Sequence, residues 1–164
     1  MMSAFRSTKK PEFTAATLRE RAMRLLARRE YAAGELTQRL QAQGAPAALA
    51  RAVVTQLVQE SWISDERFAG AFIRSRRSRG DGPLKLRAQL RERGVAADII
   101  ASQVDTHAEA DWLPQLQALC ARHFPQPAAD YAQWAKQARF LIRKGYTHDQ
   151  IRRAWPPPAQ RDFE

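Results

Sequence analysis

The chain has 164 residues, of which 45% are apolar, so it is long enough and apolar enough to fold around a hydrophobic core. A single cysteine, Cys120, and three scattered histidines exclude a disulfide framework and a zinc site. The net charge of +10 favours a polyanionic partner such as nucleic acid, or an acidic protein surface.

Apolar residues recur at helical spacing along the chain and no segment alternates as a β-strand would, which predicts an all-α fold. Residues 1–17 carry charge but lack the apolar core of a signal peptide, and we expect them to form a flexible basic terminus. A first helix is predicted from Leu18 to Glu30. Two shorter helices should follow, one with Leu36 and Leu40 on its buried face and the next with Leu49, Val53 and Leu57.

One helical segment recurs three times, over residues 35–54, 85–104 and 137–155. In each copy a leucine lies one helical turn before a glycine, an aliphatic residue follows the glycine, and another apolar residue comes one turn later. These residues are Leu40, Gly44, Leu49 and Val53, then Leu90, Gly94, Ile99 and Val104, then Leu141, Gly145, Ile151 and Trp155. The glycines lie about fifty residues apart, which indicates stacked supersecondary units.

Each copy is interpreted as a helix that ends at a left-handed glycine, followed by a turn and a second helix. Thr147 and Gln150 form a capping-box pattern, and Pro83 suits the first turn of a helix. A longer helix should precede each pair, over residues 18–30, 65–79 and 111–124. The prediction is therefore an elongated, curved array of three-helix repeats over residues 18–60, 61–106 and 107–155, with a Pro-rich tail over residues 156–164.

The most specific motif lies in the middle of the chain. It combines an Asp-x-Arg-Phe-Ala run, an aromatic and aliphatic pair, an Arg-rich stretch, Gly-x-Gly-Pro, and spaced aliphatic residues that end at a glycine. Its residues are Asp65, Arg67, Phe68, Ala69, Phe72, Ile73, Arg74, Gly80, Gly82, Pro83, Leu86, Leu90, Gly94 and Val95. This pattern, over residues 61–95, resembles the central signature of the RecX family, the bacterial modulators of the RecA recombinase.

The resemblance extends over roughly Ala22 to Trp155. It implies tandem three-helix repeats, no enzymatic activity, and a role in DNA repair and recombination. Members of the family bind the helical groove of the RecA filament on DNA and restrain its ATPase and strand exchange. Two departures stand out: Trp62-Ile63 precedes the Asp where an aliphatic residue is commoner, and Gln137 replaces a leucine in the third repeat, which concerns how tightly that repeat is packed.

Basic residues between positions 65 and 94 outnumber carboxylates nine to four, so intrahelical ion pairs cannot neutralise them. Arginine dominates, and its planar fork suits phosphates and carboxylates. Phe68, Phe72 and Ile73 should point inward and leave a cationic back. We predict one outward-facing basic surface that contacts RecA and, through phosphates and independently of sequence, DNA: Arg67, Arg74, Arg76, Arg77, Arg79, Lys85, Arg87, Arg91, Arg139, Arg143, Lys144, Arg152 and Arg153. The alternative is a solvated surface that only maintains solubility.

No Gly-rich phosphate loop, triad order or metal-ligand spacing is present, so we expect neither an enzyme nor a cofactor, a metal or a small-molecule substrate. No apolar run reaches membrane-spanning length, which together with the missing signal peptide argues for a cytoplasmic protein without a membrane partner, expected to be monomeric. Cys120 is expected to be a small buried residue. The four tryptophans are expected to pack between repeats rather than stack on bases: Trp62, Trp112, Trp134 and Trp155.

Two other functions stay open at this point. The chain could be a DNA-binding protein that acts alone, because three-helix units can present a recognition helix to the major groove. It could also be a helical-repeat adaptor for an unrelated acidic protein, which would use the same basic surface.

Overall fold

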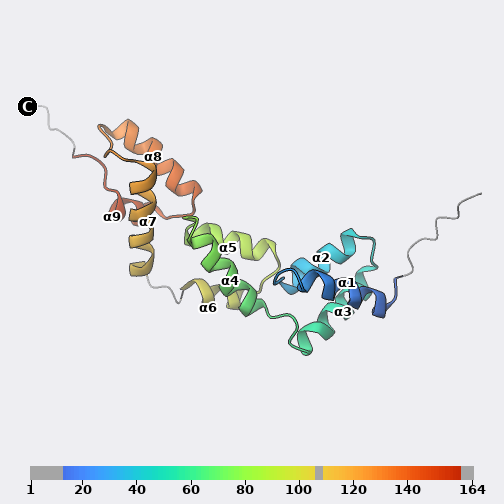
Figure 1. Ribbon diagram of the computed structural model, residues 1–164. Coiled ribbons are helices and arrows are strands. Elements are labelled where there is room, and N and C mark those ends of the chain that lie inside the picture. The colour runs from blue at the N-terminus through green and yellow to red at the C-terminus, as the bar shows by residue number, and fades with distance from the viewer. Residues whose placement is uncertain (1–12, 106–108, 160–164) are drawn as a thin grey trace, which may run out of the picture. The chain divides into compact units, whose positions relative to one another are not determined.

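The computed structural model describes residues 13–105 and 109–159, and over these residues its regular secondary structure consists of α-helices alone (Figure 1). The chain forms two compact units, which divide after Ser64. None of the described helices is long and apolar enough to cross a membrane. The helices are α1 (Ala15–Leu26), α2 (Ala33–Ala42), α3 (Ala47–Gln59), α4 (Asp65–Arg77), α5 (Pro83–Glu92), α6 (Ala97–Asp105), α7 (Glu109–His123), α8 (Tyr131–Arg143) and α9 (His148–Ala154).

The first unit is a three-helix repeat in which α3 packs against both α1 and α2. Leu18, Leu36, Leu40 and Leu57 lie at its centre without exposed surface. The predicted first helix is displaced: α1 begins three residues before Leu18, because the Thr14 side chain accepts a hydrogen bond from the Thr17 backbone in a capping box, and it ends at Leu26. Of the terminus predicted to be flexible, residues 1–12 lie outside the described part of the chain, and α1 already starts at Ala15.

The second unit contains two more sets of three helices, α4 to α6 and α7 to α9. The core of the first set includes Phe68, Ile73, Leu86 and Leu90. The core of the second set includes Leu116, Leu119, Leu141, Ile151 and the free cysteine, Cys120, which is buried as predicted. The all-α fold and the three-helix repeats are thus confirmed. The predicted boundary at residues 106 and 107 lies outside the described residues.

The glycine turns form as predicted. Gly44, Gly94 and Gly145 have φ of 97°, 77° and 94°, a region that glycine enters without steric cost. The residue after each glycine donates its backbone N–H to the carbonyl of the leucine that lies five positions earlier in each repeat, at 3.2 to 3.3 Å. This closes the helix in a Schellman-type turn and sends the chain directly into the third helix of the repeat. The predicted capping box of Thr147 and Gln150 is also present.

The alignment of the repeats needs one correction, because the predicted match shifts by one residue in the third helix. The fully or nearly buried residues are Ala50, Ile100 and Ile151, each six positions after its glycine, whereas Leu49 and Ile99 are only partly buried. Val54, Val104 and Trp155 follow at the next matching position. The three repeats therefore superpose at constant spacing from their glycines.

The Gly80-Asp81-Gly82 segment is a packed junction between the second and third repeats. The backbone N–H of Gly82 donates to the carbonyl of Lys144 at 2.7 Å, and that of Leu84 donates to the carbonyl of Gly145 at 3.0 Å. A Cβ on Gly82 would lie 2.7 Å from the backbone of Gly145, and one on Gly145 would lie 2.5 Å from the backbone nitrogen of Lys85. Both glycines are needed because two backbones approach more closely than any side chain allows.

Candidate binding surface

A buried carboxylate at this junction holds two of the basic residues predicted to face outward. Asp81 is only 3% exposed, and its Oδ1 lies 2.8 Å from the Lys85 ammonium and 3.9 Å from that of Lys144. Lys144 also donates to the carbonyl of Arg79 at 3.5 Å. Burying a carboxylate is costly unless a cation lies beside it, and the two ammonium groups offset that cost. Lys85 and Lys144 therefore contribute to the contact between repeats.

Arg77 has a similar internal position, at the contact of α4 with α7. Its guanidinium lies 4.5 Å from the centre of the Trp112 ring, its Nε donates to the Gln115 side chain at 2.9 Å, and the Gln115 amide donates back to the Arg77 carbonyl at 2.7 Å. Burial raises the pKa of the neighbouring Tyr146 phenol well above its usual range, which keeps it neutral. Arg77 therefore packs against α7 in addition to carrying a positive charge.

Two further predicted residues have partners within the second repeat. Arg87 on α5 pairs with Asp105 on α6, and the Arg76 guanidinium lies 5.3 Å from the centre of the Phe72 ring. Arg93, which the sequence analysis did not select, lies 4.7 Å from the same ring. Phe72 is therefore a half-buried ring that also contacts two guanidiniums, rather than a purely core residue, whereas Phe68 is buried as predicted. These contacts correct the expectation of one continuous outward-facing strip.

The remaining predicted cations are exposed and lie on four helices or their ends: Arg67, Arg74, Arg79, Arg91, Arg139, Arg143, Arg152 and Arg153. Arg67 and Arg153 make contacts within the chain in addition. On α8, Arg139 and Arg143 are one turn apart, and the exposed Lys136 extends the same face. Sequence reasoning missed Lys136, although its spacing of three from Arg139 indicates a shared face.

The signature residues shape the second repeat. Asp65 starts α4, Pro83 is the first residue of α5, and Leu86 and Leu90 are fully buried. Gly94 ends α5, and Gly80 has φ of 83° with Leu119 of α7 2.7 Å from where a Cβ would lie. The motif that resembles the RecX signature therefore encodes both a repeat and its junction with the next repeat.

Trp112 packs between repeats as expected, under Arg77 of the second repeat, whereas the contacts of Trp134 and Trp155 lie within the third repeat. Trp112 and Trp134 are buried, but Trp62 is 51% exposed and lies at the end of the first unit. In the third repeat the Trp155 indole donates to the Gln137 side chain at 2.7 Å, and the Trp134 indole donates to the Trp155 carbonyl at 2.8 Å. Gln137, 8% exposed, is therefore compensated by a hydrogen bond where the other repeats bury leucine.

Groups with reactive chemistry are sparse in the described residues. They contain no cluster of three or more His, Cys, Asp or Glu side chains that could hold a metal ion. Burial raises the pKa of the Cys120 thiol to about 11, so it is protonated at neutral pH. What the described residues offer a partner is a set of exposed charged side chains on packed helices.

Comparison with known proteins decides the family. Models of the first, second and third three-helix domains of RecX match residues 19–57, 64–102 and 109–155. This chain belongs to the RecX family. The regulatory protein RecX of Halorhodospira halophila is 42% identical over 138 residues, covering 84% of this chain and 85% of that protein. The regulatory protein RecX of Chromohalobacter salexigens is 41% identical over 140 residues, covering 85% and 91%.

Solved RecX structures share the fold. The crystal structure of RecX from Lactobacillus salivarius superposes with a TM-score of 0.71 at 15% identity, covering 85% of this chain and 93% of that chain. A second crystal structure of regulatory protein RecX gives a TM-score of 0.72 at 17% identity, covering 85% and 70%. The RecX relatives are named as regulatory proteins rather than enzymes. The predicted family is thus confirmed, together with its three-helix organisation.

Proposed function

We propose that this RecX-family chain is a non-enzymatic regulator that binds the RecA–DNA filament along its helical groove and restrains the ATPase and strand-exchange activities of RecA. The observation that carries this proposal is the match of all three RecX domains over residues 19–57, 64–102 and 109–155. The proposal includes a cytoplasmic protein that acts as a monomer and needs neither a cofactor nor a small-molecule substrate.

The exposed arginines support contact with an anionic partner. Arg139 and Arg143 present adjacent guanidiniums on α8, while Arg74, Arg79 and Arg91 are exposed on the second repeat. Guanidiniums suit both phosphate oxygens and carboxylates, so one surface can contact DNA and protein together. Phosphate contacts carry no base information, and binding to DNA should therefore be independent of sequence and steeply dependent on salt.

Inhibition of the ATPase requires more than binding. A regulator shifts the equilibrium between two filament states only when it binds one state more tightly than the other. The close contact between the second and third repeats is relevant here, because the backbone pairing of Gly82 and Leu84 with the 144–145 turn keeps both sets of arginines in one compact unit. Such a unit can discriminate between filament states that differ in the spacing of their subunits.

The decisive experiment measures ATP hydrolysis by RecA on single-stranded DNA as the protein is titrated in. The proposal predicts inhibition at substoichiometric to equimolar ratios, and unchanged hydrolysis at every ratio would contradict it. A parallel titration on duplex DNA without RecA separates the alternatives. Sequence-specific nanomolar binding there would favour a stand-alone DNA-binding protein, and binding to neither RecA nor DNA would favour an adaptor for another acidic protein.

A further inference from the structure

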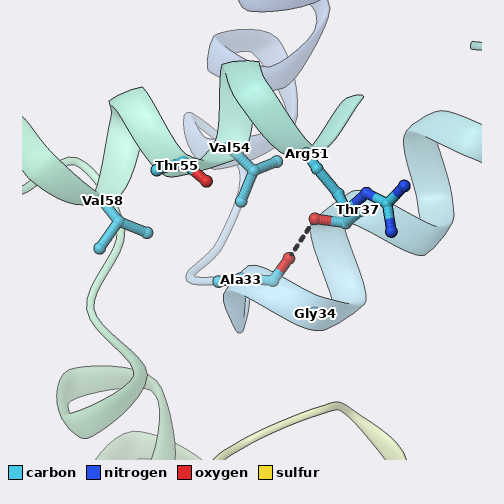
Figure 2. A pocket seen from close by; sticks show the side chains of 7 residues that line it. All are labelled: Ala33, Gly34, Thr37, Arg51, Val54, Thr55 and Val58. Atoms are coloured by element: carbon cyan, nitrogen blue, oxygen red, sulfur yellow. Dashed lines mark hydrogen bonds between the residues drawn. The ribbon is translucent and has the colours of Figure 1, made fainter. Parts of the chain in front are cut away.

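The first repeat contains a groove that the proposed regulatory surface does not use. It lies between α2 and α3, has a volume of about 280 Å³, and is shown in Figure 2. Small-molecule sites usually measure about 300 to 1,000 Å³, so this groove suits an anchoring side chain better than a whole cofactor. Its lining is mostly small or aliphatic and carries one charge: Ala33, Gly34, Thr37, Arg51, Val54, Thr55 and Val58.

The second repeat bridges the corresponding position with an ion pair between its own side chains. Aligned on Gly44 and Gly94, the first two repeats place Leu84 at the position of Gly34, Arg87 at that of Thr37, and Asp105 at that of Thr55. Arg87 and Asp105 form an ion pair that bridges α5 and α6. In the first repeat Thr37 instead donates its hydroxyl to the carbonyl of Ala33 at 2.8 Å, so no side-chain bridge replaces this ion pair there (Figure 2).

The third repeat fills the same position with aromatic rings. Aligned on Gly145, Trp134 takes the place of Ala33 and Trp155 that of Val54. Their indoles are tied to each other and to Gln137 by hydrogen bonds that link α8 with the end of α9. The third repeat thus has large side chains where the first has alanine and valine, whereas in the second repeat Leu84 is 51% exposed and the ion pair makes the bridge. In the first repeat Val58, beside the groove, is left 43% exposed.

The charge of the groove indicates what would complete it. Arg51 is exposed and contributes the only charge among the seven lining residues, whereas in the second repeat the lining cation has a carboxylate partner, Asp105. The position of that carboxylate is occupied by Thr55 in the first repeat. Relative to the second repeat the first lacks the carboxylate, and relative to the third, which has Pro156 at the position of Thr55, it lacks the two large apolar side chains. A partner can supply both.

We propose that this groove binds a short acidic segment of a protein partner, which inserts one large apolar side chain between α2 and α3 and places a neighbouring carboxylate on Arg51. The proposal goes beyond the regulatory function above and does not depend on it. The arginines of the second unit contact phosphates and carboxylates by charge alone, whereas this groove selects for an apolar anchor beside a negative charge.

The test is a ¹⁵N-HSQC titration of the full chain, without RecA or DNA, with the peptide acetyl-Asp-Phe-Glu-amide at concentrations on the order of 1 mM, where single-anchor contacts are detectable. The expected result is saturable shifts of the Gly34, Thr37, Thr55 and Val58 amides. The peptides acetyl-Asn-Phe-Gln-amide and acetyl-Asp-Ala-Glu-amide should each produce weaker shifts, because they lack the charge or the anchor.

Two variants and a matched control locate the binding. The combination Gly34→Leu, Thr37→Arg and Thr55→Asp transfers the closing side chains of the second repeat into the first and should abolish the shifts. The matched control Gln38→Arg with Ala48→Asp adds the same two charges at exposed positions outside the groove and should leave binding unchanged. Arg51→Gln should weaken binding about fivefold, as expected for an exposed ion pair. The spectrum of each variant reports directly whether it is folded.

Three outcomes would overturn the proposal. The first is no saturable shift at the groove, or equal shifts in the variant with the closed groove. The second is a stronger response of the groove amides to oligo-dT than to the peptide, which would indicate a nucleic-acid site. The third is a dependence of the groove amides on protein concentration alone, which would indicate a second copy of the chain. RecA is absent from the peptide titration, so a negative titration leaves the ATPase result unaffected. A negative ATPase result likewise leaves the titration unaffected.

Discussion

Basic residues at the junction of the second and third repeats differ from those on α8 although both groups belong to one positively charged unit. Arg77 and Lys144 lie against Trp112, Gln115 and Asp81 across the contact of two repeats, and Lys85 pairs with the same Asp81 from within the second repeat. Arg139 and Arg143 are exposed on one face of α8. The comparison teaches that a cluster of charges in a sequence can serve stability and binding side by side, and that substitutions separate the two roles.

The largest effect is expected at the glycines of the junction. Gly82→Ala places a Cβ 2.7 Å from the backbone of Gly145, and the two backbones cannot separate without breaking the hydrogen bonds between the repeats. We expect a loss of about 3 kcal/mol in the free energy of unfolding of the second unit, measured by urea denaturation. Gly70→Ala is the matched control: it lies inside α4, its Cβ would meet only the side-chain ends of Arg74 and Gln103, and it should stabilise by up to about 1 kcal/mol. Equal effects of the two substitutions would contradict a close backbone contact.

The buried carboxylate should come next. Asp81→Asn removes the negative charge that faces Lys85 and Lys144 while preserving the shape of the side chain. Because both ammonium groups are partly exposed, we expect a loss of about 1 to 2 kcal/mol, less than for a fully buried pair. Thermal unfolding measures this, with the exposed Glu92→Gln as the control that should change stability by less than about 0.5 kcal/mol. Stability unaffected by Asp81→Asn would show that the junction does not need the charge.

The exposed arginines should reverse this pattern, with a change in binding and little change in stability. Arg139→Ser with Arg143→Ser should leave the free energy of unfolding within about 0.5 kcal/mol of the original value. If both guanidiniums contact phosphates, the slope of log binding constant against log salt should fall by about 2. Fluorescence anisotropy with labelled DNA measures the slope, and inhibition of the RecA ATPase should weaken in parallel. Arg77→Gln serves as the opposite control, because its main effect should be a lower free energy of unfolding, with a smaller effect on DNA binding and its salt slope. A double serine variant with a clearly lower free energy of unfolding would show that these two arginines stabilise the fold, as the junction cations do.

The smallest effect is expected for Arg87 and Asp105. Their side chains are 41% and 50% exposed, so a double-mutant cycle with Arg87→Gln and Asp105→Asn should give a coupling energy of about 0.2 to 1 kcal/mol. The pair should weaken further as salt is added. A coupling energy well above this range would mean that the bridge between α5 and α6 contributes to the core of the repeat, and would place Arg87 with the junction cations.

Local patterns predicted much of the fold. Helical spacing, the glycines that end a helix, and the Thr147 capping box depend on contacts within a few residues, so they can be recognised without knowing the tertiary structure. The displacement of the start of α1 also has a local cause, because Thr14 and Thr17 cap the helix by reciprocal side-chain hydrogen bonds. The one-residue shift in the repeat alignment arose because partly and fully buried aliphatic residues look alike in sequence.

The candidate site was less predictable. Helical periodicity places Arg74 and Arg77, three residues apart, on neighbouring positions of α4, but it does not show that α7 brings Trp112 and Gln115 against Arg77 while Arg74 stays exposed. The Gly-Asp-Gly-Pro segment has the composition of a flexible hinge, and only the approach of the turn at Gly145 makes it a rigid contact. The groove in the first repeat depends on which side chains of α2 and α3 face each other, and only the packing of these two helices shows that.

The amino-acid sequence alone determined an all-helical chain of three repeats, because helix starts, helix ends and buried stripes are set by residues within a turn or two of one another. The family was indicated by the motif over residues 61–95 and shown by the three matching RecX domain models. The tertiary structure decided which cations are available to a partner and which bind the repeats to each other. The physical reason is that a charged side chain takes its partners from whatever lies near it in space. Gln115 lies 38 residues from Arg77 along the chain, and Lys144 meets Asp81 of another repeat, whereas Lys85, the nearer partner of Asp81, is only one helical turn away.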